Sequence, residues 1–289
     1  MSGRQFRHAL IGLAVLAGCA VAPVAPVESD VLQQAEQVLI GACMSGRGLR
    51  YWPEPKSRTP DMDRFPFVVD DEEWARNNGY GRAARKELEK AAVPAQNYFR
   101  GLPEGKRRAW LTAYHGDRSA VLEAALPVGG TVGHSAGGCV AQAWQELYGD
   151  KARWFRASRV TQTLVQMRIG QTQAAPAYGA ARQRWSACMK AAGFTADTPL
   201  ALRRERLADQ EGGAEARDRR AATAEARCAA SSGLSRTARG LDKANAAALE
   251  ARYPAEYRNA RSLREAALPR ARALIRKSLI AEQGEETPS

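Results

Sequence analysis

The sequence predicts a mainly α-helical protein with two weakly similar halves, each held together by its own disulfide, and a long aromatic-rich loop. Alanine and arginine are abundant in the chain, while isoleucine, which favours strands, is scarce. Segments with apolar residues at helical spacing follow one another with short breaks. The pattern Ala-Cys-Met-x-x-x-Gly occurs twice, which divides the chain into two similar parts. No segment alternates apolar and polar residues well enough to predict a sheet.

The composition sets limits on the class of protein. A length of 289 residues suits one large domain or two small ones, and 45% hydrophobic residues is typical of a globular chain. The formal net charge is +12, and arginine supplies most of the positive groups. Because no nucleic-acid-binding motif accompanies this charge, we expect no nucleic-acid partner.

Residues 1–18 have the pattern of a bacterial lipoprotein signal peptide. A basic start, "MSGRQFRH", precedes the apolar run "ALIGLAVLA", which is too short to span a membrane. The run leads into "LAGC", which resembles a lipobox and ends at Cys19. The resemblance implies that Cys19 becomes the lipidated N-terminus. An ordinary secretory signal, cleaved nearby, is the alternative.

Residues 19–29 follow as the lipidated cysteine and a proline-rich tether. Ten residues at about 3.1 Å each would hold the folded part about 30 Å from the bilayer. Removal of the signal peptide takes away two arginines and no acids, which lowers the net charge from +12 to +10. We therefore expect a protein on the extracytoplasmic face of the cell membrane. Its expected partners are the membrane, through the lipid, and a cell-envelope protein or anionic wall polymer.

Residues 30–149 are expected to form the first helical half. Ser29 and Asp30, with Gln33 behind them, predict the start of a helix. An aromatic-rich loop over residues 49–81 follows and is predicted either to pack over the helices or to line a ligand groove. The candidate groove residues are Tyr51, Trp52, Trp74 and Tyr80. Further helices are predicted over Arg82–Ala92, Glu104–Tyr114, Asp117–Ala125 and Cys139–Tyr148.

Residues 150–289 are expected to form the second helical half, with charged helices at its C-terminal end. Helices are predicted over Lys151–Ile169, Ala177–Ala192, Pro199–Ser231 and Ser235–Glu282. Pro254 and Pro269 are expected to bend or break the last of these helices. The charged stretch "EARDRRAATAEAR" has helical charge pairing and predicts a solvated helix face.

The two Ala-Cys-Met-x-x-x-Gly segments predict two similar helix ends. Gly48 and Gly193 stand where a helix commonly ends in a left-handed glycine. In such a Schellman ending the next residue packs on the residue five positions earlier. The pattern therefore predicts that Leu49 contacts Met44, and likewise that Phe194 contacts Met189.

Four cysteines remain besides Cys19, an even number that favours two disulfides in an oxidising compartment. Of the three pairings, we expect Cys43–Cys139 and Cys188–Cys228, since each joins a helix end to the next cysteine within its own half. The absence of C-x-x-C and H-x-x-x-H spacings argues against a metal site. No cofactor motif is present either, so no cofactor and no metal are expected.

The stretch "GHSAGG" matches the G-x-S-x-G pattern of serine esterases, with Ser135 as the nucleophile. Esterases of this type place the serine after a strand, and we expect no strand in "LPVGGTV". No histidine follows Ser135 in the chain, so the usual order of the catalytic triad is not met. We therefore expect no catalytic residue here.

The acidic run Asp70–Glu73 supports two alternatives. Adjacent acids before a helix commonly cap its N-terminus, where the helix dipole favours negative charge. Paired carboxylates also serve glycosidases, so an envelope hydrolase acting on a cell-wall or glycan substrate through Asp70–Glu73 is the alternative function. The first expectation is a non-catalytic binding or scaffold role with an unknown ligand.

Several segments together resemble a family of secreted lipoproteins from high-GC Gram-positive bacteria. The resemblance covers most of the mature chain and rests on "CMSGRGLRYWPEP", "NNGYGR", "GGCVAQAWQELYG" and "WSACMKAAGF". The family has no established activity, fold or ligand. The resemblance therefore implies lipid anchoring and four paired cysteines, and it implies no catalytic residue.

The lipobox generates a direct prediction. We expect Cys19→Ala to release the protein from the membrane fraction or to leave its signal peptide uncleaved, because the acyl chains attach to this thiol. Cell fractionation with metabolic lipid labelling checks this outcome. An unchanged lipid label on the variant would contradict the lipoprotein assignment.

Overall fold

The computed structural model describes residues 28–55 and 64–285, and in this part of the chain the protein is mainly helical, as predicted. The predicted signal peptide, Cys19 and most of the tether lie outside the described residues. The elements are α1 (Glu28–Gly46), α2 (Glu72–Asn78), α3 (Arg82–Gly101), α4 (Glu104–His115), β1 (Val121–Ala125), β2 (Thr131–Ser135), α5 (Gly138–Tyr148), α6 (Lys151–Ala174), α7 (Pro176–Ala191), α8 (Pro199–Ala208), α9 (Ala214–Ser231), α10 (Leu234–Arg252) and α11 (Pro254–Glu285).

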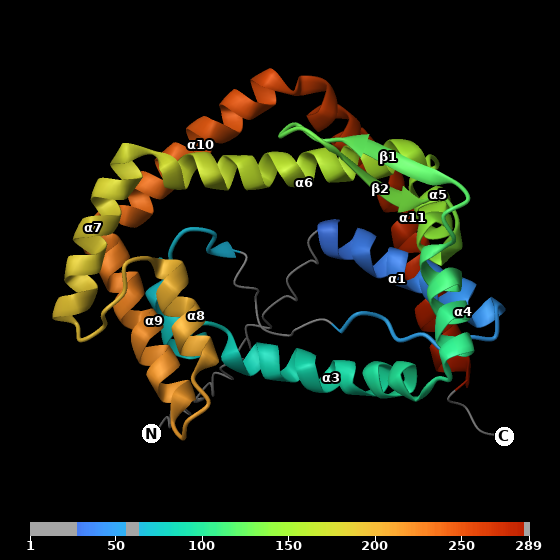
Figure 1. Cartoon of the computed structure of the whole chain (residues 1–289), viewed down its shortest axis with the longest axis horizontal. Coiled ribbons are helices and arrows are strands. Elements are labelled where there is room, and N and C mark those ends of the chain that lie inside the picture. The colour runs from blue at the N-terminus through green and yellow to red at the C-terminus, as the bar shows by residue number, and fades with distance from the viewer. Residues whose placement is uncertain (1–27, 56–63, 286–289) are drawn as a thin grey trace, which may run out of the picture.

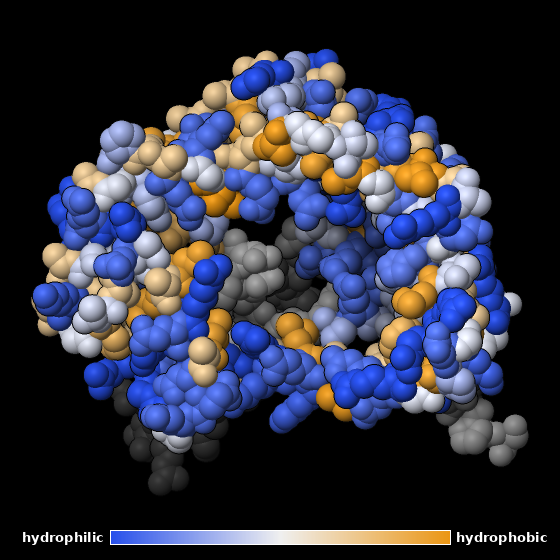
Figure 2. Space-filling model, viewed as in Figure 1, coloured by the Kyte–Doolittle hydropathy of each residue, from blue (hydrophilic) through white to orange (hydrophobic). Residues whose placement is uncertain are grey.

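The helices form two groups at opposite ends of the molecule (Figure 1). α7, α8 and α9 gather at one end, while α1, α4, α5 and α11 gather at the other. α6 connects the two ends along one edge, and α3 runs along the opposite edge. Between these parts the space-filling view shows an opening bordered largely by hydrophilic residues (Figure 2). Within the described residues, no helix has the length and apolar character needed to cross a membrane.

Each end of the molecule has its own hydrophobic core. The first core cluster joins α1, α4, α5, the hairpin, the start of α6 and α11. In α11 the buried residues recur at helical spacing and face α1, which is the helix it contacts most. The buried residues of this stripe are Ala260, Leu263, Ala267, Leu268 and Ala271.

The second core cluster joins residues 65–80, α7, α8, α9 and the start of α10. Its largest fully buried side chains include Trp185, Tyr80 and Met189. The two clusters do not divide the chain at residue 150. The last helix packs into the first cluster, and the second part of the aromatic loop packs into the second.

Both repeated segments end in the predicted Schellman arrangement. At the end of α1 the Gly48 amide donates to the Ser45 carbonyl (2.9 Å), and the Leu49 amide donates to the Met44 carbonyl (3.0 Å). After α7, the Phe194 amide donates to the Met189 carbonyl in the same way (2.9 Å). Gly48 and Gly193 have φ values of 69° and 86°, which glycine adopts without strain.

The predicted disulfide pairing is confirmed. Cys43 is bonded to Cys139, and Cys188 to Cys228, with a Cα–Cα distance of 5.6 Å in each pair. The first bond joins the last turn of α1 to the first turn of α5, and the second joins α7 to α9. Each disulfide thus ties together two helices of one core cluster, close to a Schellman ending.

β1 and β2 form a hairpin, and its presence shows that two predictions were wrong. A helix was expected over Asp117–Ala125, and no sheet was expected. β1 and β2 pair antiparallel, with Val121 opposite Ser135. Alternate side chains of β1 are buried, and Gly129 and Gly130 close the turn at positive φ. The helix prediction was wrong because alanine and leucine favour helices locally, whereas the turn and the buried face of β1 favour a strand.

Several helix boundaries differ from the prediction. Ser29 and Asp30 lie inside the first turn of α1 rather than before it. The helix predicted to end at Ala92 continues through Pro94, an exposed residue, to Gly101. α6 likewise extends to Ala174, five residues beyond its predicted end.

Two predicted helices are each divided in two. Gly213, at a φ of 78°, separates α8 from α9 where one helix was expected from Pro199 to Ser231. Pro254 starts α11 and separates it from α10, since proline suits the first turn of a helix. Pro269, by contrast, lies inside α11 and does not end it.

Buried carboxyl groups of α9 hold residues 64–80 in place. Glu225, fully buried, accepts hydrogen bonds from the Val69 amide (2.8 Å) and the Tyr80 hydroxyl (2.5 Å). Asp218 accepts one from the Tyr80 amide (3.0 Å). A Cβ atom on Gly79 would lie 2.3 Å from a carboxylate oxygen of Asp218, so this close approach requires glycine.

Burial raises the pKa of Glu225 from 4.5 to about 7, although its hydrogen bonds with Tyr80 and Val69 and the charge of Arg203 act in the opposite direction. Between these two pH values the folded protein binds the proton more tightly than the unfolded chain does. Stability from this group is therefore present at low pH and is lost as the pH rises towards 7.

We predict that Glu225→Gln removes this dependence, because glutamine stays neutral. The difference in free energy of unfolding between the unmodified protein and the variant should fall by about 3 kcal/mol between pH 4.5 and 7. Urea denaturation across this range measures it. Glu87→Gln, at an exposed position of α3, is the matched control. If the difference in free energy of unfolding between the unmodified protein and Glu225→Gln did not change with pH, the raised pKa of Glu225 would be contradicted.

Candidate anion-binding site

The predicted groove residues lie in two different places. The Tyr51 hydroxyl donates to Gln37, and its ring stacks on Tyr114 with centroids 5.9 Å apart. Trp52 packs against Tyr98 at 5.1 Å. These residues are partly buried beside the first core cluster, at the α3–α4 end of the molecule.

Trp74 and Tyr80 belong instead to the second core cluster, where both are buried. Trp74 packs edge-on against Phe65, with ring centroids 4.8 Å apart. The Tyr80 hydroxyl is occupied by Glu225. The four aromatic residues therefore do not line one groove, and this part of the aromatic loop packs on the helices.

The acidic run Asp70–Glu73 forms the start of α2. Asp71 is the N-cap, and its carboxylate accepts from the Trp74 amide (2.9 Å). Asp70 forms an ion pair with Arg239, and burial raises its pKa. Glu72 accepts from Arg227, which lowers its pKa. These three carboxylates serve capping and ion pairing.

Ser135 ends β2, so the strand that the sequence did not predict is present. Its hydroxyl accepts from the Gly137 amide (3.1 Å), and Gly116 packs closely against it. The neighbouring His134 directs Nδ1 towards the Ser135 carbonyl oxygen (2.8 Å), while its ring packs on Trp144. No histidine nitrogen of the described residues forms a hydrogen bond with the Ser135 hydroxyl.

A groove rich in arginine lies on the outer face of α9. It has a volume of about 410 Å³, and α9, α2 and the turn after α7 form its walls. The α9 residues that line it recur at helical spacing on one face. The groove residues are Arg76, Ala192, Phe194, Arg219, Arg220, Thr223, Ala224 and Arg227. We call this the α9 groove.

Two carboxylates balance part of the positive charge of the α9 groove. Glu72 pairs with Arg227 (2.8 Å) and with Arg76 (3.4 Å), and Glu215 pairs with Arg219 (2.7 Å). These pairs are exposed, so each contributes little to stability and leaves its arginine accessible to another anion. Four arginines against two carboxylates leave an excess of two positive charges.

Arg220 is the arginine of the groove without a carboxylate partner among the described residues. Its guanidinium carbon lies 5.8 Å from the centroid of the Phe194 ring, a cation–π contact. Phe194 is itself placed by the Schellman ending of α7. The helix ending thus positions an aromatic ring beneath a cation that faces solvent.

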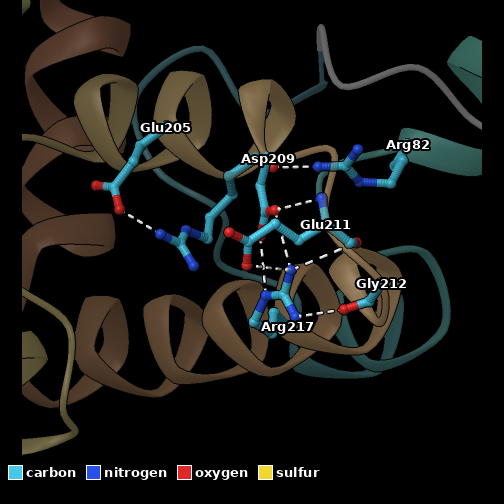
Figure 3. Close-up of polar contacts among 7 residues, drawn as sticks. Arg82, Glu205, Asp209, Glu211, Gly212 and Arg217 are labelled. Carbon is cyan, nitrogen blue, oxygen red and sulfur yellow. Dashed lines mark hydrogen bonds and ion pairs between the residues drawn. The ribbon is translucent and has the colours of Figure 1, made fainter.

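A second cavity of about 230 Å³ adjoins the groove and shares Phe194 and Arg220 with it. Its other arginines are neutralised, as Figure 3 shows. Asp209 accepts two hydrogen bonds from Arg217 (2.8 and 2.9 Å), and this pairing lowers the pKa of Asp209 to about 2. Arg217 also donates to the Gly212 carbonyl (2.7 Å), while Arg206 pairs with Glu205.

The contacts in Figure 3 therefore stabilise the α8–α9 connection. Arg82, buried at the start of α3, donates to the Arg206 carbonyl and fixes the end of α8. The arginines that a ligand can reach are therefore those of the α9 groove, between α2 and α9. Within the described ranges, no cluster of histidine, cysteine, aspartate or glutamate could hold a metal ion.

Three of the four arginines of the α9 groove lie in one charged stretch of the sequence, residues 215–227. The stretch "EARDRRAATAEAR" predicts a solvated helix face, and Arg220 and Arg227 are exposed. Asp218 and Glu225 of the same stretch are buried, so the prediction holds for one face of α9 and is wrong for the other. Arg76 and Phe194 come from distant parts of the chain, so the sequence could not show that they meet α9. Comparison with protein-family models, curated proteins and solved structures finds no match to this chain.

We predict that Ser135 is not a nucleophile. A serine-directed fluorophosphonate probe should leave it unlabelled, because its hydroxyl accepts from a backbone amide and has no histidine base. Mass spectrometry of the treated protein checks this, with Ser135→Ala expected to have the same thermal stability as the unmodified chain to within about 0.5 kcal/mol. Stoichiometric labelling at Ser135 would show that the esterase motif is functional.

Proposed function

We propose that this protein is a lipid-anchored, extracytoplasmic binding protein that holds an anionic cell-wall polymer in the α9 groove. The observation that carries the proposal is the unpaired Arg220 within a groove of four arginines. A negatively charged polymer would neutralise this local excess of charge. The lipobox at Cys19 and the two disulfides support a location outside the cytoplasm.

The shape of the α9 groove favours an extended ligand. It is open to solvent along α9 and has an apolar floor of Phe194, Ala192 and Ala224 between its arginines. Guanidinium groups bind phosphate and carboxylate oxygens through pairs of N–H donors. In the free protein the carboxylates of Glu72 and Glu215 bind two of these guanidinium groups, and a polyanion would compete with them.

The arrangement of Asp70, Asp71 and Glu72 gives less support to the alternative function, a hydrolase. Asp71 caps α2, Glu72 contacts two arginines, and Asp70 contacts Arg239. Neither Glu72 nor Asp71 is directed into an apolar pocket that would keep it protonated as a general acid. We therefore assign these carboxylates to the start of α2 and to its contact with α9 and α10.

Replacement of groove arginines tests the proposal. The double variant Arg220→Gln with Arg227→Gln should bind poly(glycerol phosphate) about five- to thirtyfold more weakly, since two charge contacts contribute about 1–2 kcal/mol. Biolayer interferometry on the immobilised polymer measures the affinity. Binding should also weaken as salt rises, because the ligand contacts exposed charges.

The matched control is Arg85→Gln with Arg108→Gln. Both arginines are exposed and pair with a glutamate four residues away, so the control removes the same number of charges elsewhere. It should leave polymer affinity within about twofold of the unmodified protein, as expected for charges outside the site. Equal losses in the two double variants would indicate a response to net charge alone and would contradict the proposed site.

A further inference from the structure

A smaller pocket lies between α7, α8 and the segment before α2, and it shares no lining residue with the α9 groove. It has a volume of about 210 Å³, space for about seven water molecules. Four of its residues are apolar or proline, and five carry polar groups. They are Pro66, Phe67, Pro199 and Leu200, with Gln173, Tyr178, Arg182, Thr198 and Arg203.

Tyr178 supplies a hydroxyl group without a hydrogen-bond partner among the described residues. Its side chain is packed against Phe67, with ring centroids 6.2 Å apart, and only 4% of the residue is exposed. Its hydroxyl makes no hydrogen bond with any other described residue, while Arg182 lies close enough to act on its charge. Because Tyr178 lines the pocket, its hydroxyl is free to donate a hydrogen bond to a ligand that enters it.

Two arginines of the pocket are fixed in place but not neutralised. Arg182 donates to the Asp197 carbonyl (2.9 Å), and Arg203 donates to the Phe65 carbonyl (3.1 Å). Neither forms an ion pair with a described carboxylate. Each uses one donor in these contacts, and a guanidinium has five N–H donors in all. The Nε of Arg203 is buried and has no acceptor.

The carboxyl group of Glu225, which lies near Arg203, does not neutralise it. Glu225 lies close enough for its pKa to respond to the charge of Arg203, but the carboxyl group binds Val69 and Tyr80 instead. The first turn of α8, capped by Thr198, also faces the pocket with the positive end of its helix dipole. The polar side of the pocket is therefore positive.

The remaining side of the pocket is apolar. Phe67 and Pro199 are buried, whereas Leu200 is 46% exposed at the edge of the pocket. A large aliphatic side chain left exposed beside unpaired cations is suited to an amphiphilic ligand. The volume limits this ligand to about the size of one substituted ring.

We propose that this pocket binds a small carboxylic acid with a compact apolar body, such as an aryl-acetic acid. The carboxylate would lie between Arg182 and Arg203 and accept a hydrogen bond from the Tyr178 hydroxyl. The apolar body would pack on Phe67, Pro199 and Leu200. This inference is independent of the polymer site, since the two sites have no residue in common.

Calorimetric titration of the full mature chain with phenylacetate tests the proposal. We expect binding with a dissociation constant below about 1 mM, and binding of the neutral phenylacetamide at least about tenfold weaker, because only the acid carries the charge. Acetate and inorganic phosphate, which lack the apolar body, should also bind at least about tenfold more weakly. Phosphate binding as tight as that of phenylacetate would overturn the proposal.

Tyr178→Phe is the most informative variant, because it removes only the hydroxyl. The affinity for phenylacetate should fall about fivefold, the effect of one hydrogen bond, while the melting temperature stays unchanged because no internal bond is lost. Arg182→Gln should weaken binding at least about tenfold, as expected for a charge-assisted contact. Equal affinities of Tyr178→Phe and the unmodified protein would overturn the proposed geometry.

Tyr148→Phe is the matched control. Tyr148 belongs to the first core cluster and its hydroxyl donates to Glu36, so the variant should lose stability and keep its phenylacetate affinity. A similar loss of affinity in Tyr148→Phe and Tyr178→Phe would show a general response to tyrosine replacement and contradict the site. No detectable heat with phenylacetate at about 10 mM would also overturn the proposal, since that excludes affinities in the expected range.

Discussion

The inner face of α9 determines where both candidate sites lie. Glu225 and Asp218 bind the backbone and side chain of residues 64–80, and they carry that segment onto the helix. One part of the segment brings Arg76 and Glu72 to the outer edge of α9, and another brings Phe67 to α7. Buried carboxyl groups are costly unless hydrogen-bonded. Both oxygens of Glu225 and one oxygen of Asp218 accept hydrogen bonds from this segment, so its position on α9 is strongly specified.

The disulfides and helix endings act together in both cores. Each Ala-Cys-Met-x-x-x-Gly segment buries its methionine, ends at a left-handed glycine and places its cysteine one turn before that glycine. The cysteine then bonds to a second helix of the same cluster. In the second copy the residue after the glycine is Phe194, which forms the floor of the α9 groove. A local rule of helix termination therefore also shapes a candidate binding surface.

The helical class, the disulfide pairing and the Schellman endings could be predicted because they depend on short-range patterns and on the number of cysteines. The hairpin could not, because "VLEAA" favours a helix locally and becomes a strand only through its turn and its buried face. The grouping of Trp74 and Tyr80 with α9 was also missed. It depends on Asp218 and Glu225, which lie more than 130 residues away along the chain.

Arginines have two roles in this structure, since some join helices and others line the candidate sites. Arg168 pairs with Asp242 between α6 and α10, and Arg270 binds the Leu147 carbonyl at the end of α5, so these cations hold helices together. The arginines of the candidate sites that lack a carboxylate partner among the described residues, Arg182, Arg203 and Arg220, belong to α7, α8 and α9 at one end of the molecule (Figure 1). The helix that follows the proposed tether, α1, packs into the opposite core. In the proposed arrangement the end that contains α1 is therefore anchored, while both candidate sites lie at the opposite end, away from the tether.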